Sequence, residues 1–179
     1  MFDADPGQDL AAAVGEGAAN YFVLVYNFYG NQPVVVHQNV PDGTLFDITV
    51  ADLGEPDGKP EIILADVEFA EVRVFEQAMN VYVEVASVVV GGSPIEVTSV
   101  ALRGGGSPDM ISLNGLSGAV SVVATIHGGL DPVLDLEPFE PGVYVSGMAV
   151  ADFDNDGFQD IAVVEPQGQV AVFRNQSGD

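Results

Sequence analysis

The stretch that decides the fold is Val150-Ala-Asp-Phe-Asp-Asn-Asp-Gly-Phe-Gln-Asp-Ile-Ala-Val-Val164. It begins with aliphatic residues, continues through a loop with Asp at every second position, and ends in an aliphatic run. Gly157 gives this loop the freedom to turn sharply. The β-branched residues of 161–164 suit an extended strand. The stretch therefore predicts two strands joined by a tight acidic loop.

The same pattern occurs three more times along the chain, at residues 2–10, 50–63 and 100–111. The carboxylates that close the four copies are separated by 52, 48 and 51 residues, and they are Asp9, Glu61, Asp109 and Asp160. A repeat of about 50 residues holding four short strands has the size of one propeller blade. We therefore predict a single repeat region over residues 1–179, with units at roughly 1–43, 44–94, 95–142 and 143–179.

The segments between the copies have the pattern of strands. Residues 71–75 and 82–85 alternate between apolar and polar side chains, which is typical of half-buried strands. No segment has a helical period, and a longer run at 119–126 predicts one further strand. We predict an all-β chain of about three and a half antiparallel blades, with three, four, four and three strands in successive units.

The composition excludes several classes of protein. The 179 residues include 27 acidic and 4 basic side chains, which gives a formal net charge of −23. Nucleic-acid binding needs clustered Lys and Arg, so we expect no nucleic-acid partner. The longest apolar run, 21–26, is too short to span a bilayer. The absence of Cys excludes disulfides and thiolate metal sites.

The acidic loop has the chemistry of a calcium site. Ca²⁺ takes six to eight oxygen ligands, and alternate Asp residues in a tight loop can direct several carboxylates to one point. An EF-hand begins in a similar way, but its bidentate Glu stands at loop position 12, which is Val163 here. The loop at 152–160 is therefore predicted to bind calcium between two strands.

Residues 150–175 resemble the FG-GAP or VCBS repeats, which form the blades of integrin-α-like β-propellers. The resemblance implies that Ca²⁺ is the cofactor and that its ligands are Asp152, Asp154, Asp156, the Phe158 main chain and Asp160. It carries over to the first unit at Asp3, Asp5 and Asp9, where Met1 stands in the position of the leading Asp.

The two middle copies fit this pattern less well. The copy at 52–61 matches it loosely, with Asp52, Asp57 and Glu61, because its loop has one extra residue. The copy at 101–109 has Arg103 and three glycines in place of the carboxylates, so we expect no cation there.

The predicted function is a calcium-stabilised extracellular or cell-surface scaffold or recognition module. We expect a protein or glycan partner and no catalysis, because His37 and His127 are isolated and no nucleophile stands beside a base. One alternative is a carbohydrate-active lyase or hydrolase that uses a pair of the 27 carboxylates. Another is a structural subunit of a surface filament.

The terminal units are predicted to be incomplete. The first begins inside its acidic loop, and the last ends after the strand at 169–174. Because open sheet edges recruit further strands, we expect either self-association or the remainder of a longer chain.

Overall fold

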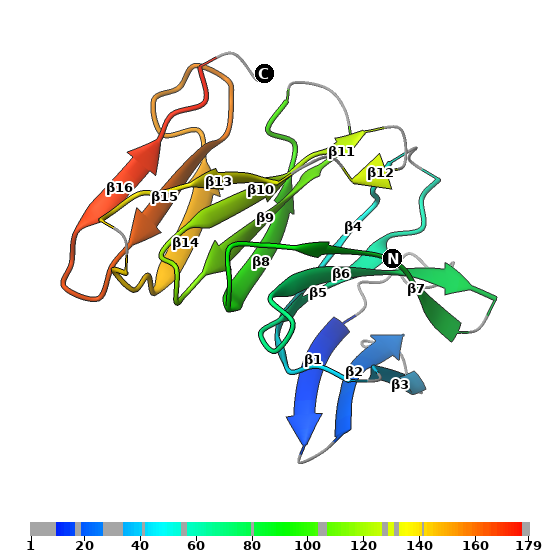
Figure 1. Ribbon diagram of the computed structural model, residues 1–179. Helices are drawn as coiled ribbons and strands as arrows, with labels where there is room; N and C mark the ends of the chain where they lie inside the picture. The colour runs from blue at the N-terminus through cyan, green and yellow to red at the C-terminus, as the bar shows by residue number, and fades with distance from the viewer. Residues whose placement is uncertain are drawn as a thin grey trace.

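The computed structural model describes residues 10–16, 19–26, 34–40, 42–54, 57–79, 81–103, 107–126, 129–130, 133–140 and 142–176. Within these ranges every regular element is a β-strand (Figure 1). The all-β prediction is confirmed. Among the same residues, no helix is long and apolar enough to cross a membrane.

The strands form four antiparallel sheets that follow one another in chain order, and a small hairpin. The first sheet contains β1 (Leu10–Glu16), β2 (Ala19–Tyr26) and β3 (Val34–Val40). The second contains β4 (Leu45–Ala51), β5 (Glu61–Asp66), β6 (Glu71–Ala78) and β7 (Val81–Val89). The third contains β8 (Pro94–Val100), β9 (Asp109–Asn114), β10 (Val120–Val123) and β13 (Leu134–Leu136). The fourth contains β14 (Gly147–Ala151), β15 (Asp160–Val164) and β16 (Val170–Phe173), and the hairpin pairs β11 (Thr125–Ile126) with β12 (Gly129–Leu130).

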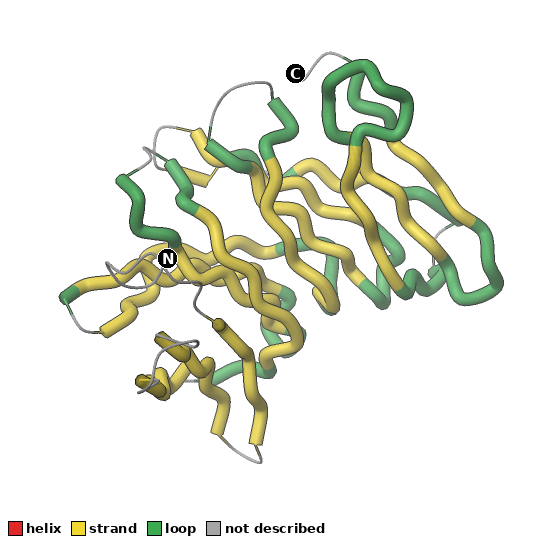
Figure 2. Tube along the Cα trace, turned by 180° about the vertical axis from the view of Figure 1, so that it is seen from behind, coloured by secondary structure: helices red, strands yellow, loops and turns green. Residues whose placement is uncertain are grey.

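The four sheets are arranged as successive propeller blades. The first strands of neighbouring sheets contact one another, β1 with β4, β4 with β8, and β8 with β14. From these strands the sheets extend outward side by side, as the two opposite views show (Figures 1 and 2). Among the described residues, the numbers of strands in these four sheets agree with the predicted three, four, four and three, and the third unit also holds the two short strands of the hairpin. The boundaries of the sequence units stay a prediction.

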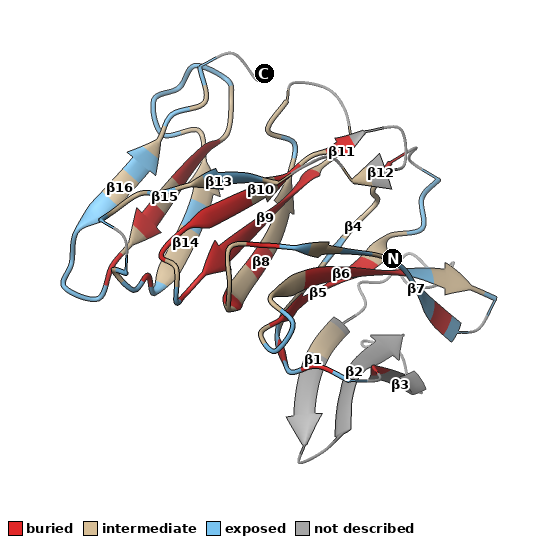
Figure 3. Ribbon diagram, viewed as in Figure 1, coloured by how far each residue is buried: buried red, intermediate tan, exposed pale blue. Residues whose placement is uncertain are grey.

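The described residues form three apolar core clusters, one between each pair of successive sheets. β5 shows how one strand serves two of them. Ile62 and Leu64 pack toward the first sheet, whereas Ile63 and Ala65 pack toward the third. Because both faces are buried, residues 62–65 of β5 are all apolar and do not alternate with polar residues (Figure 3).

The described residues cover the fourth sheet on one face only. Ile161 and Val163 are buried against the third sheet, while Val170 and Val172 on β16 are 62% and 47% exposed. Val172 pairs across the strands with Ala162, so its side chain lies on the opposite face from Ile161. The outer face of this sheet is therefore small, apolar and accessible.

One predicted strand is divided in the structure. The run at 119–126 forms β10 and β11, with Ala124 between them. The Thr125 amide donates to Asp109 Oδ1 at 3.3 Å, and its hydroxyl donates to the Pro108 carbonyl at 2.5 Å. These bonds hold Thr125 at the start of β9, so the chain leaves the sheet and forms the β11–β12 hairpin.

Candidate metal centre

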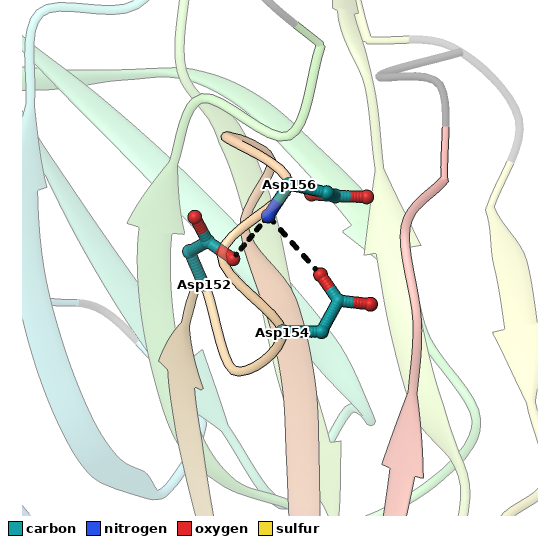
Figure 4. Close-up of side chains that lie close together, drawn as sticks. All are labelled: Asp152, Asp154 and Asp156. Carbon is teal, nitrogen blue, oxygen red and sulfur yellow. Dashed lines mark hydrogen bonds between the residues drawn. The ribbon is translucent and has the colours of Figure 1, made fainter.

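The acidic loop at 152–159 connects β14 to β15, the first and second strands of the fourth sheet. One carboxylate oxygen from each of Asp152, Asp154 and Asp156 lies within 4.8 Å of the other two (Figure 4). The pairing of Ala151 with Asp160 closes the loop at its base. The alternate spacing of the three Asp residues thus brings their side chains together, as expected.

Backbone amides hold the carboxylates in place. The Asp156 amide donates to Asp152 Oδ1 at 3.2 Å and to Asp154 Oδ1 at 3.3 Å (Figure 4). The Gly157 amide donates to Asp152 Oδ2 at 3.0 Å, and the Phe158 amide to Asp156 Oδ1 at 2.9 Å. Gly157 has a φ of +97°, a conformation in which a side chain would be strained. The loop is therefore folded around its own acidic groups.

Asp160 has a different position from the other three. It is fully buried, and its Oδ2 accepts from the Phe153 amide at 3.0 Å and its Oδ1 from the Asn175 amide at 2.8 Å. It does not belong to the group whose oxygens gather within 4.8 Å. In this arrangement Asp160 joins the start of the loop to the end of β16. Coordination by Asp160 and by the Phe158 carbonyl stays a prediction.

The donor set fits a hard divalent cation. Three carboxylates supply oxygen ligands only, which suits Ca²⁺ better than softer metals. Among the described residues, the one ion pair of this group joins Arg174 Nη1 to Asp154 Oδ2 at 3.7 Å, and the Arg174 side chain is 64% exposed. The group therefore keeps an excess of negative charge at an exposed turn.

The second loop has the same backbone frame as the fourth, although it is one residue longer. Asp52 accepts from the amides of Asp57 and Gly58, at 3.2 and 2.9 Å, as Asp152 does from Asp156 and Gly157. Here, however, the Lys59 ammonium lies 3.1 Å from Asp57 Oδ2. A side-chain cation of the protein itself thus balances one carboxylate of this loop.

Glu61 closes the second loop in the way that Asp160 closes the fourth. Its Oε2 accepts from the Leu53 amide at 2.7 Å. Burial raises the pKa of Glu61, and the nearby charges of Asp52 and Asp57 act in the same direction, while the bond from Leu53 opposes them.

The third loop holds an arginine against its closing carboxylate. Arg103 Nη2 lies 2.5 Å from Oδ1 of the buried Asp109, and it also donates to the Thr125 carbonyl at 3.3 Å. We expected no cation here because the loop lacks most of the carboxylates of the pattern. In the structure, the Arg103 guanidinium contacts Asp109, the carboxylate that this copy keeps. The sequence signal was the placement of Lys59 and Arg103 in two repeat loops of a chain with only four basic residues.

The first loop, with Asp3, Asp5 and Asp9, lies outside the described residues. His127 lies outside them as well, and no side-chain geometry is described for His37.

Two comparisons with known proteins, one with family models and one with solved structures, agree with this architecture. Residues 144–176 match the family model of the FG-GAP repeat, which includes the acidic loop, β15 and β16. Among curated proteins there is no significant match. Among solved structures, the chain is similar to BBS1N, crystallised in complex with ARL6DN and soaked with lead, with a TM-score of 0.53 and 12% sequence identity.

The match to BBS1N covers 77% of this chain and 42% of that chain, so this chain spans less than half of BBS1N. At this identity the likeness shows the fold alone, which is of the β-propeller type. The predicted FG-GAP resemblance is confirmed for residues 144–176.

Proposed function

We propose that this chain, which carries an FG-GAP repeat on propeller-type sheets, is a calcium-stabilised module that serves as an extracellular scaffold or recognition element. The convergence of Asp152, Asp154 and Asp156 in the loop of that repeat carries the proposal. Propellers support many functions, so we infer the function from this loop and not from the fold.

The protein's own residues prepare the loop for a cation. Asp152 and Asp154 are held by the Asp156 amide, so part of the entropy of gathering them is lost on folding, before a cation arrives. Asp160 joins the loop to Asn175, which follows β16. When bound, Ca²⁺ would supply the positive charge that three neighbouring carboxylates lack. The loop then stabilises the β14–β15–β16 sheet, because binding to the folded state alone favours folding by mass action.

An extracellular location is consistent with the exposed position of the loop. Asp154 and Asp156 face solvent, and extracellular calcium modules typically bind with dissociation constants of about 10⁻⁴–10⁻³ M. At such affinities the loop is filled where calcium is abundant. We propose a protein or glycan as the partner of the module.

Thermal unfolding with and without calcium tests the proposal. Millimolar CaCl₂ should raise the Tm of the chain, and excess EDTA should reverse the rise. MgCl₂ should act more weakly, because Mg²⁺ demands a stricter octahedral geometry and gives up its water reluctantly. An equal Tm in CaCl₂ and EDTA would refute calcium stabilisation. A glycan array probed with the calcium-loaded chain then tests recognition.

A carbohydrate-active enzyme is the second candidate, because one cavity collects several carboxylates. Asp57, Glu61 and Glu76 line a space of about 440 Å³ beside the second sheet, with Thr125 and Leu130 on the other side. A glycosidase needs an acid that keeps its proton and a second carboxylate nearby. The raised pKa of Glu61 suits the first role. This candidate would be supported if the wild-type chain cleaved a polysaccharide by hydrolysis or elimination and the Glu76→Gln variant did not. It would be refuted if the wild-type chain cleaved no polysaccharide in a substrate panel.

Self-association is proposed through the outer face of the fourth sheet, with a second copy of the chain as the partner. The corresponding faces of the second and third sheets are covered by the next sheet, and the face with Val170 and Val172 has the same small apolar character. Light scattering should show association of the wild type and its loss in Val172→Lys. Val83→Lys, a change at an exposed valine of β7, is the matched control. A monomeric wild type would contradict this partner.

A further inference from the structure

We propose that the cavity between the third and fourth sheets binds a small amphiphilic carboxylate, an aliphatic or aromatic body that ends in one carboxylate group. The cavity has a volume of about 480 Å³, within the range of small-molecule sites. It lies at the outer side of the apolar cluster that joins these two sheets.

The apolar side chains that line the cavity favour an apolar group in the ligand. Val122 and Leu136 contribute from β10 and β13, and Ile161 and Phe173 from β15 and β16. Ile161 is buried, whereas the other three are partly exposed, so the cavity is an opening into the core. Filling it with an apolar group would remove this surface from water, at a gain of roughly 25 cal/mol per Å².

The charged side chains that line the cavity favour a negatively charged group in the ligand. Arg103 and Arg174 both line this cavity, although the whole chain has only 4 basic residues, and the one carboxylate in the lining, Asp109, is paired with Arg103. The cavity beside β6 and β7 is built from the third and fourth strands of its own sheet in the same way, but it carries Asp57, Glu61 and Glu76. The cavity beside β6 and β7 thus has three carboxylates and no basic side chain, whereas the proposed cavity has two guanidinium groups and one carboxylate, so the proposed cavity is the one that suits an anion.

Both arginines have N–H groups that can donate hydrogen bonds to a carboxylate of the ligand. The Arg103 contacts with Asp109 and Thr125 go through Nη2, whereas a guanidinium has five N–H donors in a planar fork. These contacts fix its position at the rim, where its side chain is 36% exposed. Arg174 is more exposed and lies 3.7 Å from Asp154, which is longer than a hydrogen bond. A carboxylate at the mouth of the cavity would therefore replace a loose contact of Arg174 with a charge-assisted one.

Arg174 also connects this cavity to the acidic loop. If the loop binds calcium, as the proposed function states, the cation takes over the neutralisation of Asp154 and leaves Arg174 to the ligand. Calcium should then increase the affinity for the carboxylate, and by linkage the carboxylate should increase the affinity for calcium by the same factor.

Isothermal titration calorimetry with octanoate tests the proposal on the full chain. Octanoate should bind, whereas octanol, with the same chain and no charge, should bind about tenfold more weakly. Arg174→Gln should weaken octanoate binding by about tenfold and leave octanol binding unchanged. Lys59→Gln removes an equal charge at the second loop, away from this cavity, and should leave octanoate binding unchanged.

Three results would overturn the proposal: no heat of binding with octanoate, equal affinities for octanoate and octanol, or equal losses in Arg174→Gln and Lys59→Gln. The link to the loop is tested separately, by repeating the titration in CaCl₂. If calcium raises the Tm but leaves octanoate affinity unchanged, the shared role of Arg174 is wrong. If calcium leaves the Tm unchanged while octanoate still binds through Arg174, the proposed function fails and the cavity site stands.

Discussion

Asp156→Asn should change stability in opposite directions in the absence and presence of calcium. The substitution is close to isosteric, and the Asn carbonyl oxygen can still accept the Phe158 amide, as Asp156 Oδ1 does at 2.9 Å. What the variant removes is one of three negative charges. In EDTA this relieves repulsion with Asp152 and Asp154, and in CaCl₂ it removes a charged ligand.

The size of the effect follows from the geometry. Two unit charges 4.8 Å apart repel by about 0.9 kcal/mol in water, and the carboxylate oxygens lie within this distance. Removing one charge relieves two such pairs, so stability in EDTA at low salt should rise by about 1–2 kcal/mol, and less at physiological salt. For a chain of this size that is about 3–6 °C in Tm. In CaCl₂ the wild type gains about 2.7 kcal/mol at a hundredfold excess over its dissociation constant, and most of this gain should be lost.

Differential scanning fluorimetry of the two proteins in EDTA and in CaCl₂ measures this crossover. Asp57→Asn is the control, because Asp57 stands in the corresponding loop of the second sheet but faces Lys59 at 3.1 Å. Its Tm should change little in either buffer. If Asp156→Asn is less stable than the wild type in EDTA, the carboxylates do not repel as argued. If it responds to calcium as the wild type does, Asp156 is not a ligand.

Three further substitutions test contacts within the second sheet and its loops. Arg73→Met should lower the free energy of unfolding in urea by about 3 kcal/mol, because it leaves the fully buried Asp66 without the guanidinium 3.1 Å away; unchanged stability would contradict a structural role for this pair. Gly43→Ala should destabilise more than Gly58→Ala: both glycines have positive φ, but an added Cβ would collide with Asp66 only at Gly43, so equal losses would rule out the collision. Glu61→Gln should stabilise the chain at neutral pH and lose this advantage as the pH falls through the raised pKa of Glu61 to its ordinary value of 4.5, since a carboxyl with a raised pKa costs stability only when ionised; a constant difference in urea midpoint from pH 4 to 7 would contradict it.

The local features of this protein could be predicted from its sequence. Gly157 and the alternate Asp residues of 152–156 lie within one turn of chain, so their spacing alone indicates that they gather. The aliphatic run at 161–164 begins β15 within one residue of the expected position. The repeat of about 50 residues indicated successive sheets, because each repeat forms one antiparallel unit from neighbouring segments.

Features that depend on distant contacts could not be predicted in this way. The division of the run at 119–126 follows from bonds between Thr125 and the start of β9, more than ten residues away in sequence. The separate position of Asp160 depends on the Asn175 amide, which reaches it only after β16 has folded back. The spacing of residues along the sequence does not reveal the hydrogen-bond partners of Thr125 or of Asp160.

By itself, the sequence determined the class of fold, the repeat and the acidic loop, since these depend on periodicity and on side chains a few residues apart. Only the tertiary structure decided which distant charges meet. The Lys59–Asp57 pair is local to one loop, whereas Arg103 and Arg174 come from different sheets to one cavity. The physical reason is that electrostatic interactions depend on distance in space and on burial, and both are set by how the sheets pack.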